Sequence, residues 1–309
     1  MRELAASVLI PTHDHGPTLR ASVASALRQT VTDIEVLIIG DGVSDGTRDI
    51  VRELRTADER VRFFDFPKGP RHGEVYRHQV LGGARGRIVC YLADDDLYLP
   101  HHVEEMEALL QQADLAQALV GVVLTDGGLV ARTVDLTLPF YRREILADRD
   151  GIHLSATAHT LALYRSLAEG WTTTPPGTAT DRYMLRKLLR HPGCRCRSSA
   201  SLTVLAFPAS LRQGWTAADR LPELLTWRER VAGEEGLSKL NELVLTQKVR
   251  DAAAAQARLL EATANPAALV GDFLRHHLRD VRLARAVCAW YRSRFSRSVT
   301  GGVGVPRAR

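Results

Sequence analysis

The segment between residues 6 and 125 alternates short apolar runs with longer stretches of helical periodicity, and this alternation restricts the fold more than any other feature. The apolar runs cover residues 7–10, 35–39, 61–66 and 88–92. Between the first runs, Leu19, Val23 and Ala26 share one helical face, and Ile50 and Leu54 share another. The pattern is typical of βαβ units, so we predict an α/β fold with a mostly parallel central sheet and flanking helices.

The pattern changes twice farther along the chain. Asp126, Gly127 and Gly128 give a turn signal between two apolar runs, and a hairpin there would make the sheet mixed. After Trp215 the strand-like runs stop, and helical character continues to about Arg294. We therefore expect an α/β body that ends near residue 215 and a helical extension with a flexible glycine-rich tail.

Composition and charge exclude several classes of protein. No apolar run approaches the length of about 18 residues that a bilayer span needs, so we expect neither a membrane helix nor a secretory signal. The four cysteines lack the paired spacing of a zinc site and fit a reducing cytoplasm. The net charge is +5, and only four of the 41 basic residues are lysine. Abundant arginine suits an anionic substrate, although genomic base composition has the same effect.

Polar residues follow three of the predicted strands, where open α/β sheets bind their ligands. These segments are residues 11–14, 41–47 and 94–96. Asp94, Asp95 and Asp96 crowd like charges together, which favours either a divalent metal or a solvated acidic turn before the next helix. Asp41 can accept a hydrogen bond from a nucleotide base, or the segment can be a plain strand-to-helix turn capped by Ser44 or Asp45.

Other catalytic motifs are absent from the sequence. It contains no Walker loop, GxGxxG turn, GxSxG elbow or HExxH helix, so kinase, dehydrogenase, hydrolase and zinc-protease functions lose support. His13 and His15 alternate after a strand without evident further ligands, which disfavours a zinc site formed by both.

The three polar segments together resemble family 2 glycosyltransferases of the GT-A fold, over about residues 5–205. Residues 7–14 resemble the opening strand and nucleotide loop of that family, and residues 36–47 resemble its paired-aspartate turn, with Gly40 in place of the first aspartate. Residues 76–86 resemble the helix that precedes the metal strand. The resemblance implies that the nucleotide sugar contacts Pro11, Thr12, His13, Asp14, Asp41, Arg77, Asp94, Asp95 and His159.

Residues 91–100 resemble the DxD region of the family, which holds Mn²⁺ or Mg²⁺. Ala93 occupies the usual first acidic position, so the resemblance assigns the metal to Asp95 and Asp96. Residues 159–184 resemble the acceptor half, and this likeness implies Asp181 as the general base. A carboxylate at the start of a helix is favoured as an ion, as a base requires.

The resemblance implies a metal-dependent inverting glycosyltransferase with a UDP-sugar as the first choice of donor. Residues 1–215 would form the catalytic domain, with donor binding in 1–100 and the acceptor half in 101–215, and residues 216–309 would form the extension. The acceptor is a hydroxyl of a glycan, a lipid-linked sugar or a small natural product, and no nucleic-acid partner is expected. A non-catalytic nucleotide- or glycan-binding module and a sugar nucleotidyltransferase are the alternatives.

Two further segments have expected roles. Residues 172–177 have the composition of a mobile lid. In the C-terminal extension, apolar residues recur every fourth position from Leu283 to Phe295. That face would pack on the catalytic body, mediate self-association, or bring the protein to the periphery of an anionic membrane.

Overall fold

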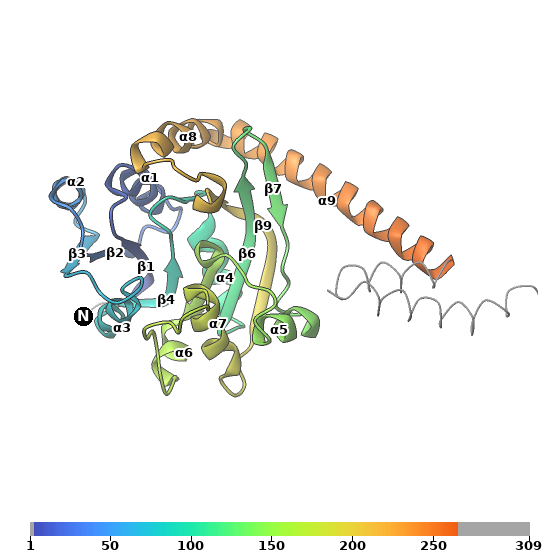
Figure 1. Cartoon of the computed structure of the whole chain (residues 1–309), viewed down its shortest axis with the longest axis horizontal. Helices are drawn as coiled ribbons and strands as arrows, with labels where there is room; N and C mark the ends of the chain where they lie inside the picture. The colour runs from blue at the N-terminus through green and yellow to red at the C-terminus, as the bar shows by residue number, and fades with distance from the viewer. Residues whose placement is uncertain (1–2, 265–309) are drawn as a thin grey trace, which may run out of the picture. The chain divides into compact units, whose positions relative to one another are not determined.

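The computed structural model describes residues 3–264, and these residues contain a mixed sheet covered by helices on both faces (Figure 1). In the described part of the chain the strand order is β3-β2-β1-β4-β8-β6-β9-β5, and β7 pairs with the C-terminal half of β6, outside this order. The strands are β1 Leu4–Thr12, β2 Ile34–Asp41, β3 Val61–Phe66, β4 Gly86–Tyr91, β5 Leu97–Tyr98, β6 Leu115–Val123, β7 Leu129–Arg132, β8 Thr157–Thr160 and β9 Cys196–Ala206.

The first four strands are parallel, as their apolar runs predict. Antiparallel pairing begins where β8 joins β4, and β6 then pairs antiparallel with both β8 and the predicted hairpin partner β7. The prediction of an α/β fold with a mixed sheet is therefore confirmed, with β6 and β9 parallel and with as many antiparallel as parallel pairings among the described strands. Parallel pairing matters for the site because it brings the carboxyl ends of β1, β2 and β4 to one edge.

Helices α1 Gly16–Leu27, α2 Asp45–Ala57 and α4 His102–Leu110 cover one face of the sheet. Ser44 caps α2 by accepting a hydrogen bond from the Thr47 backbone N–H. The opposite face packs against α3 Glu74–Gly82, α5 Pro139–Leu146, α6 Leu161–Ser166 and α7 Thr180–Arg190. Short 3₁₀ turns at Leu154–Ala156 and Ala209–Leu211 complete the connections. Each helix buries an apolar stripe, and the two faces form separate hydrophobic cores.

Helical structure after residue 216 is confirmed as far as the structure describes it, by α8 Ala217–Arg230 and α9 Gly233–Ala264. The first compact unit extends to Val244, because Leu224, Trp227 and Leu240 pack with β5, β6 and β9 in a third core. Helix α8 is thus part of the body, beyond the boundary expected near residue 215. The second unit begins at Leu245, and the apolar face expected at 283–295 lies outside the described residues. Among residues 3–264, no helix combines the length and the apolar character that a bilayer crossing requires.

Candidate active site

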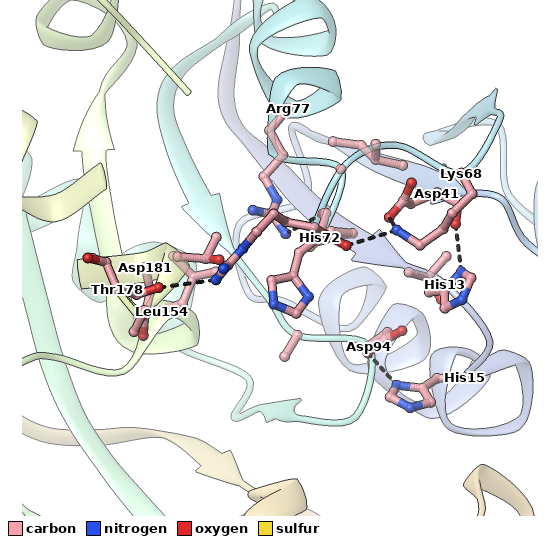
Figure 2. Close-up of a pocket in the computed structure, with 18 residues that line it drawn as sticks. His13, His15, Asp41, Lys68, His72, Arg77, Asp94, Leu154, Thr178 and Asp181 are labelled. Carbon is pink, nitrogen blue, oxygen red and sulfur yellow. Dashed lines mark hydrogen bonds and ion pairs between the residues drawn. The ribbon is translucent and has the colours of Figure 1, made fainter. Parts of the chain in front are cut away.

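A cleft of about 500 Å³ opens at the carboxyl ends of β1 and β2, and residues on α3 and α7 complete its walls. Figure 2 shows its lining. Of the residues assigned from the sequence, the lining contains Pro11, Thr12, His13, Asp41, Arg77, Asp94 and Asp181. It also contains residues that the sequence did not single out for ligand binding, namely His15, Lys68, Arg71, His72 and Thr178. The structure thus joins the two halves of the predicted site in one cavity.

Asp41 ends β2 and is held rigidly, with 6% of its surface exposed. Its carboxylate accepts hydrogen bonds from Lys68 Nζ at 2.6 Å and from the Gly69 backbone N–H at 2.6 Å. Lys68 also donates to the carbonyls of Gly69 and Arg71, so all three of its N–H donors are used. A Cβ at Gly73, which has a φ of 59°, would lie 2.6 Å from the Asp41 carboxyl carbon, so this close approach requires glycine. The Asp41 carboxylate oxygens still have lone pairs that can accept a hydrogen bond from a ligand.

His13 lies beside Asp41 at the mouth of the cleft, and its Nδ1 donates to the Asp41 carbonyl at 2.6 Å. That bond fixes the imidazole plane at an exposed position, where the ring can stack on a base. Thr12 is buried in the same wall, and its hydroxyl has no partner among the described residues. Asp14 is exposed and does not contribute to the lining.

Arg77 projects from α3 into the cleft with only 6% of its surface exposed (Figure 2). Its guanidinium carbon lies 4.8 Å from the centroid of the Trp171 ring, and Nη2 donates to the His72 carbonyl at 3.4 Å. Nε and Nη1 are buried without a partner in the part of the chain that the structure describes. Burial lowers the pKa of Arg77, because it disfavours the charged form. A buried guanidinium with unused donors is costly unless an anion occupies the cavity.

The acidic turn after β4 separates its three aspartates into different environments. Asp94 accepts a hydrogen bond from His15 Nδ1 at 3.0 Å, and Asp95 accepts one from Arg220 of α8 at 2.5 Å. Asp96 is buried, and its two oxygens accept from the Ser155 hydroxyl at 2.5 Å and the Phe207 backbone N–H at 2.9 Å. Asp96 therefore fastens the turn to the core, and the structure does not bring it to the cleft.

One group of described residues has the geometry of a metal site. His15, Asp94 and Asp95 each place a ligand atom within 4.8 Å of the others. Burial and the charges of Asp96 and Asp94 raise the pKa of Asp95 to about 7, while Arg220 acts in the opposite direction. The hydrogen bond to Asp94 raises the pKa of His15 against the effect of burial. One imidazole and two carboxylates suit Mn²⁺ better than Mg²⁺, which prefers oxygen ligands only.

Asp181 is the second residue of α7 and lines the cleft opposite Arg77. One of its carboxylate oxygens accepts a hydrogen bond from the Arg182 backbone N–H at 2.8 Å. Glu74 fixes this helix start, because it accepts a hydrogen bond from the Thr180 hydroxyl at 3.1 Å. Burial would raise the pKa of Glu74, but its hydrogen bonds outweigh burial and lower it. Asp181 therefore lies at the anchored start of α7, on the side of the cleft across from Asp41.

His159 lies in the core beneath the cleft and not in its lining. Its Nδ1 donates to the Thr160 carbonyl at 2.9 Å, so Nε2 accepts from the Tyr91 hydroxyl at 2.8 Å. The Tyr91 oxygen in turn accepts from Trp171 Nε1 at 3.0 Å. Burial lowers the pKa of His159 to about 4, which keeps the ring neutral. His159 thus supports Trp171, on which Arg77 rests, and it does not reach a ligand directly.

Curated relatives match part of the chain. A β-1,3-glucosyltransferase of Campylobacter jejuni, named for a GalNAc(5)-diNAcBac-PP-undecaprenol acceptor, is 29% identical over 37% of this chain and 36% of its own length. A glucosyltransferase of Escherichia coli, WfgD, named for UDP-Glc and α-D-GlcNAc-diphosphoundecaprenol, is 27% identical over 38% of this chain and 45% of its own length. The chain therefore spans less than half the length of these relatives.

Solved structures show the fold. Staphylococcus aureus TarS 1–349 in complex with UDP-GlcNAc superposes with a TM-score of 0.56 at 17% identity, covering 88% of this chain and 81% of TarS 1–349. The family model for glycosyl transferase family 2 matches residues 7–169, just over half of the chain. Those residues include most of β1 and all of β2 and β4, which end at the cleft. The chain therefore belongs to glycosyl transferase family 2.

Proposed function

We propose that the protein is a metal-dependent inverting glycosyltransferase that moves a sugar from a nucleotide-sugar donor, with UDP-sugar as the first choice, to an acceptor hydroxyl. The observation that carries the proposal is one cleft that contains Asp41, the buried Arg77 with unused donors, Asp94 and Asp181. Asp41 suits a nucleotide base and Arg77 suits a diphosphate. Asp94 suits a metal ion, and Asp181 can take a proton from the acceptor hydroxyl. The relatives named for glucosyl transfer support the same reaction class.

Each part of the donor has a group suited to it. Asp41 accepts the imide N–H of uracil, and the imidazole of His13 stacks on the ring. Arg77 donates to the diphosphate from its unused Nε and Nη1. His15, Asp94 and Asp95 would hold Mn²⁺, which supplies charge stabilisation to the leaving diphosphate. Arg220 positions the Asp95 carboxylate from behind.

Asp181 acts on the acceptor. Its carboxylate takes the proton from the acceptor hydroxyl as that oxygen forms a bond to the anomeric carbon. The bond between the anomeric carbon and the diphosphate oxygen breaks, and its electron pair leaves with the diphosphate. A single displacement of this kind inverts the anomeric configuration. No second carboxylate is required to protonate a leaving group that is already an anion.

Calorimetric titration of UDP, dTDP and GDP, each with and without Mn²⁺, tests the proposal. We expect one nucleotide to bind in a Mn²⁺-dependent manner, and we expect Asp94→Asn to lose at least tenfold in that affinity. Asp126→Asn is the matched control, because Asp126 is an exposed aspartate in the turn between β6 and β7, outside the cleft. Absence of nucleotide binding under all conditions would leave a family 2 fold without a donor site.

A further inference from the structure

A second cavity of about 410 Å³ lies on the other side of Asp181 from the donor cleft. The two cavities share Ala179 and Asp181 in their linings. A group in the second cavity can therefore reach the carboxylate that faces the donor cleft. None of the residues assigned from the sequence, apart from Asp181, lines this second cavity.

Gln117 of β6 gives the second cavity a buried polar wall. Only 2% of its surface is exposed, and its Oε1 has no hydrogen-bond partner among the described residues. Flanking sheet positions such as Leu115 and Leu119 are apolar, as expected for a central strand. An unsatisfied buried carbonyl is costly, so a ligand O–H or N–H at this place would offset the cost.

Three arginines from three different elements surround the same cavity. Arg132 belongs to β7, Arg149 follows α5, and Arg182 belongs to α7. Asp150 and Asp181 are the acidic side chains of the lining, so its formal charge is positive by one. The arginines pair in turn with Asp150, Glu144 and Asp148, and their side chains are 52%, 63% and 35% exposed. Exposed ion pairs of this kind are weak, so each arginine can exchange its partner for an incoming anion.

Apart from His153, most of the remaining wall is apolar. Val120, Val122, Val134 and Ile152 line the cavity, and aliphatic side chains of this kind can pack against the C–H groups of a sugar ring. The cavity thus combines an apolar wall, an unsatisfied carbonyl and three guanidinium groups, each held in an ion pair. This is the complement of a sugar that carries hydroxyl groups and one anionic substituent.

We infer that this cavity is the acceptor site and that it selects an anionic sugar, one that carries a phosphate or a carboxylate. Gln117 accepts a hydrogen bond from a ring hydroxyl, the arginines hold the anion, and Asp181 takes the proton of the attacking hydroxyl. The inference rests on the proposed function, because it assigns to Asp181, which lines both cavities, the role of the base.

The test uses three glucose derivatives that share one ring: glucose 1-phosphate, glucuronic acid and neutral methyl glucoside. Their affinities for the full chain are measured by ligand-observed NMR. We expect an anionic derivative to bind about tenfold more tightly than methyl glucoside, and the two anionic arms distinguish phosphate from carboxylate. Gln117→Leu should weaken all binding about tenfold, whereas Arg132→Gln should weaken only the anions.

Three controls assign the result to this cavity. Arg55→Gln on α2 removes an exposed arginine away from both cavities and should change nothing. Arg77→Gln should reduce UDP affinity and leave glucose 1-phosphate affinity unchanged. Thermal unfolding checks that Gln117→Leu is folded, and Arg132 is exposed enough for its substitution to spare the fold.

Equal affinity for methyl glucoside and the anions would overturn the inference. So would absence of binding, or anion binding that Arg77→Gln abolishes and Gln117→Leu spares, because the phosphate would then lie in the donor cleft. Loss of the proposed function has a different signature. In that case UDP would fail to bind the wild-type protein, whatever the glucose derivatives do.

Discussion

The two walls of the cleft hold their charged groups in opposite ways. On the wall formed by α3 and the ends of β1, β2 and β4, the side chains of Asp41, Arg77 and Asp94 are buried and fixed by hydrogen bonds or ring contacts. On the wall that contains the start of α7, Asp181 is half-buried, and Arg182 pairs with Asp148 near the surface. A preorganised wall suits a ligand of constant structure such as a nucleotide diphosphate, whereas an adaptable wall suits an acceptor that varies among relatives.

The walls share a common support. The hydrogen-bonded chain from Trp171 through Tyr91 to His159 crosses from the loop before α7 to β4 and β8. Arg77 of the first wall rests on Trp171, which lies in the loop before α7. The two walls therefore differ in how exposed their charged side chains are, but the same buried hydrogen-bonded residues support both. Substitutions on each wall should then separate binding from chemistry.

The largest effect should come from Asp181→Asn, which removes the proposed base and keeps the shape of the side chain. We expect kcat for UDP-sugar hydrolysis or transfer to fall by about 10²–10⁴, the usual contribution of a general base. Nucleotide affinity should stay within about threefold, because Asp181 lies on the acceptor wall. Steady-state kinetics and calorimetry on the same protein make the comparison, with Asp126→Asn as the control. A parallel loss of nucleotide affinity would contradict the division between the walls.

Arg220→Met should cost the most stability, because it removes the buried cation that pairs with the half-buried Asp95 carboxylate beside Asp94 and Asp96. We expect the free energy of unfolding to fall by about 3–5 kcal/mol in urea titrations without metal. Mn²⁺ should restore part of this loss in the variant, since Asp95 is a candidate ligand. The double variant Arg220→Met/Asp95→Asn is the matched control and should recover most of the stability. A single variant as stable as the wild type would mean that Asp95 is not charged in the folded protein.

Arg77→Gln tests the buried wall directly. We expect about a 30-fold loss in UDP affinity and almost no change for uridine, because the lost donors face the diphosphate and not the base. Arg55→Gln on α2 is the control, since Arg55 is an exposed arginine outside the cleft. Equal losses of affinity for UDP and for uridine would show that Arg77 stabilises the structure of the cleft and does not bind the diphosphate.

The preorganised wall is also the one that the sequence predicts best. The apolar runs of β1, β2 and β4 identify the strand ends, so Asp41 and Asp94 could be assigned to the cleft from local pattern. Strand β8 has the sequence Thr-Ala-His-Thr, which carries no such pattern. His159 was therefore assigned by resemblance alone, and the structure places it in the core.

Long-range pairs account for the other differences. Arg220 lies 125 residues from Asp95 in the sequence. The local sequence around the acidic turn therefore could not predict that Arg220 pairs with Asp95. His15 turns toward Asp94 because the chain leaves β1 and enters α1 at Gly16, whereas His13 turns toward Asp41. Gln117 reads as part of an apolar strand, and only the neighbouring elements reveal that it faces a cavity.

The shared support should weaken in acid. Burial lowers the pKa of His159 to about 4 from an ordinary value of 6.5, so between these pH values the unfolded chain binds a proton that the folded protein excludes. Stability is then present above pH 6.5 and is lost as the pH falls toward 4, by roughly 2 kcal/mol at pH 5. His102, whose pKa burial lowers to about 3, adds a similar loss. Urea midpoints at pH 7 and 5 measure the change, and His159→Gln should halve it. An unchanged pH dependence in that variant would exclude His159 as the cause.

The smallest effect should come from Arg71→Gly, at the point where the two walls touch. Arg71 has a φ of 54°, which glycine adopts more readily, so the substitution should relieve up to about 1 kcal/mol of backbone strain. It also removes the exposed bond to Thr178, which is worth little. We expect a thermal midpoint equal to or above that of the wild type, and UDP affinity within about threefold. Arg71→Lys keeps the strain and is the control. If Arg71→Gly lowered transfer tenfold while UDP still bound, the contact between the walls would be part of the catalytic arrangement, and the two walls would work as one unit.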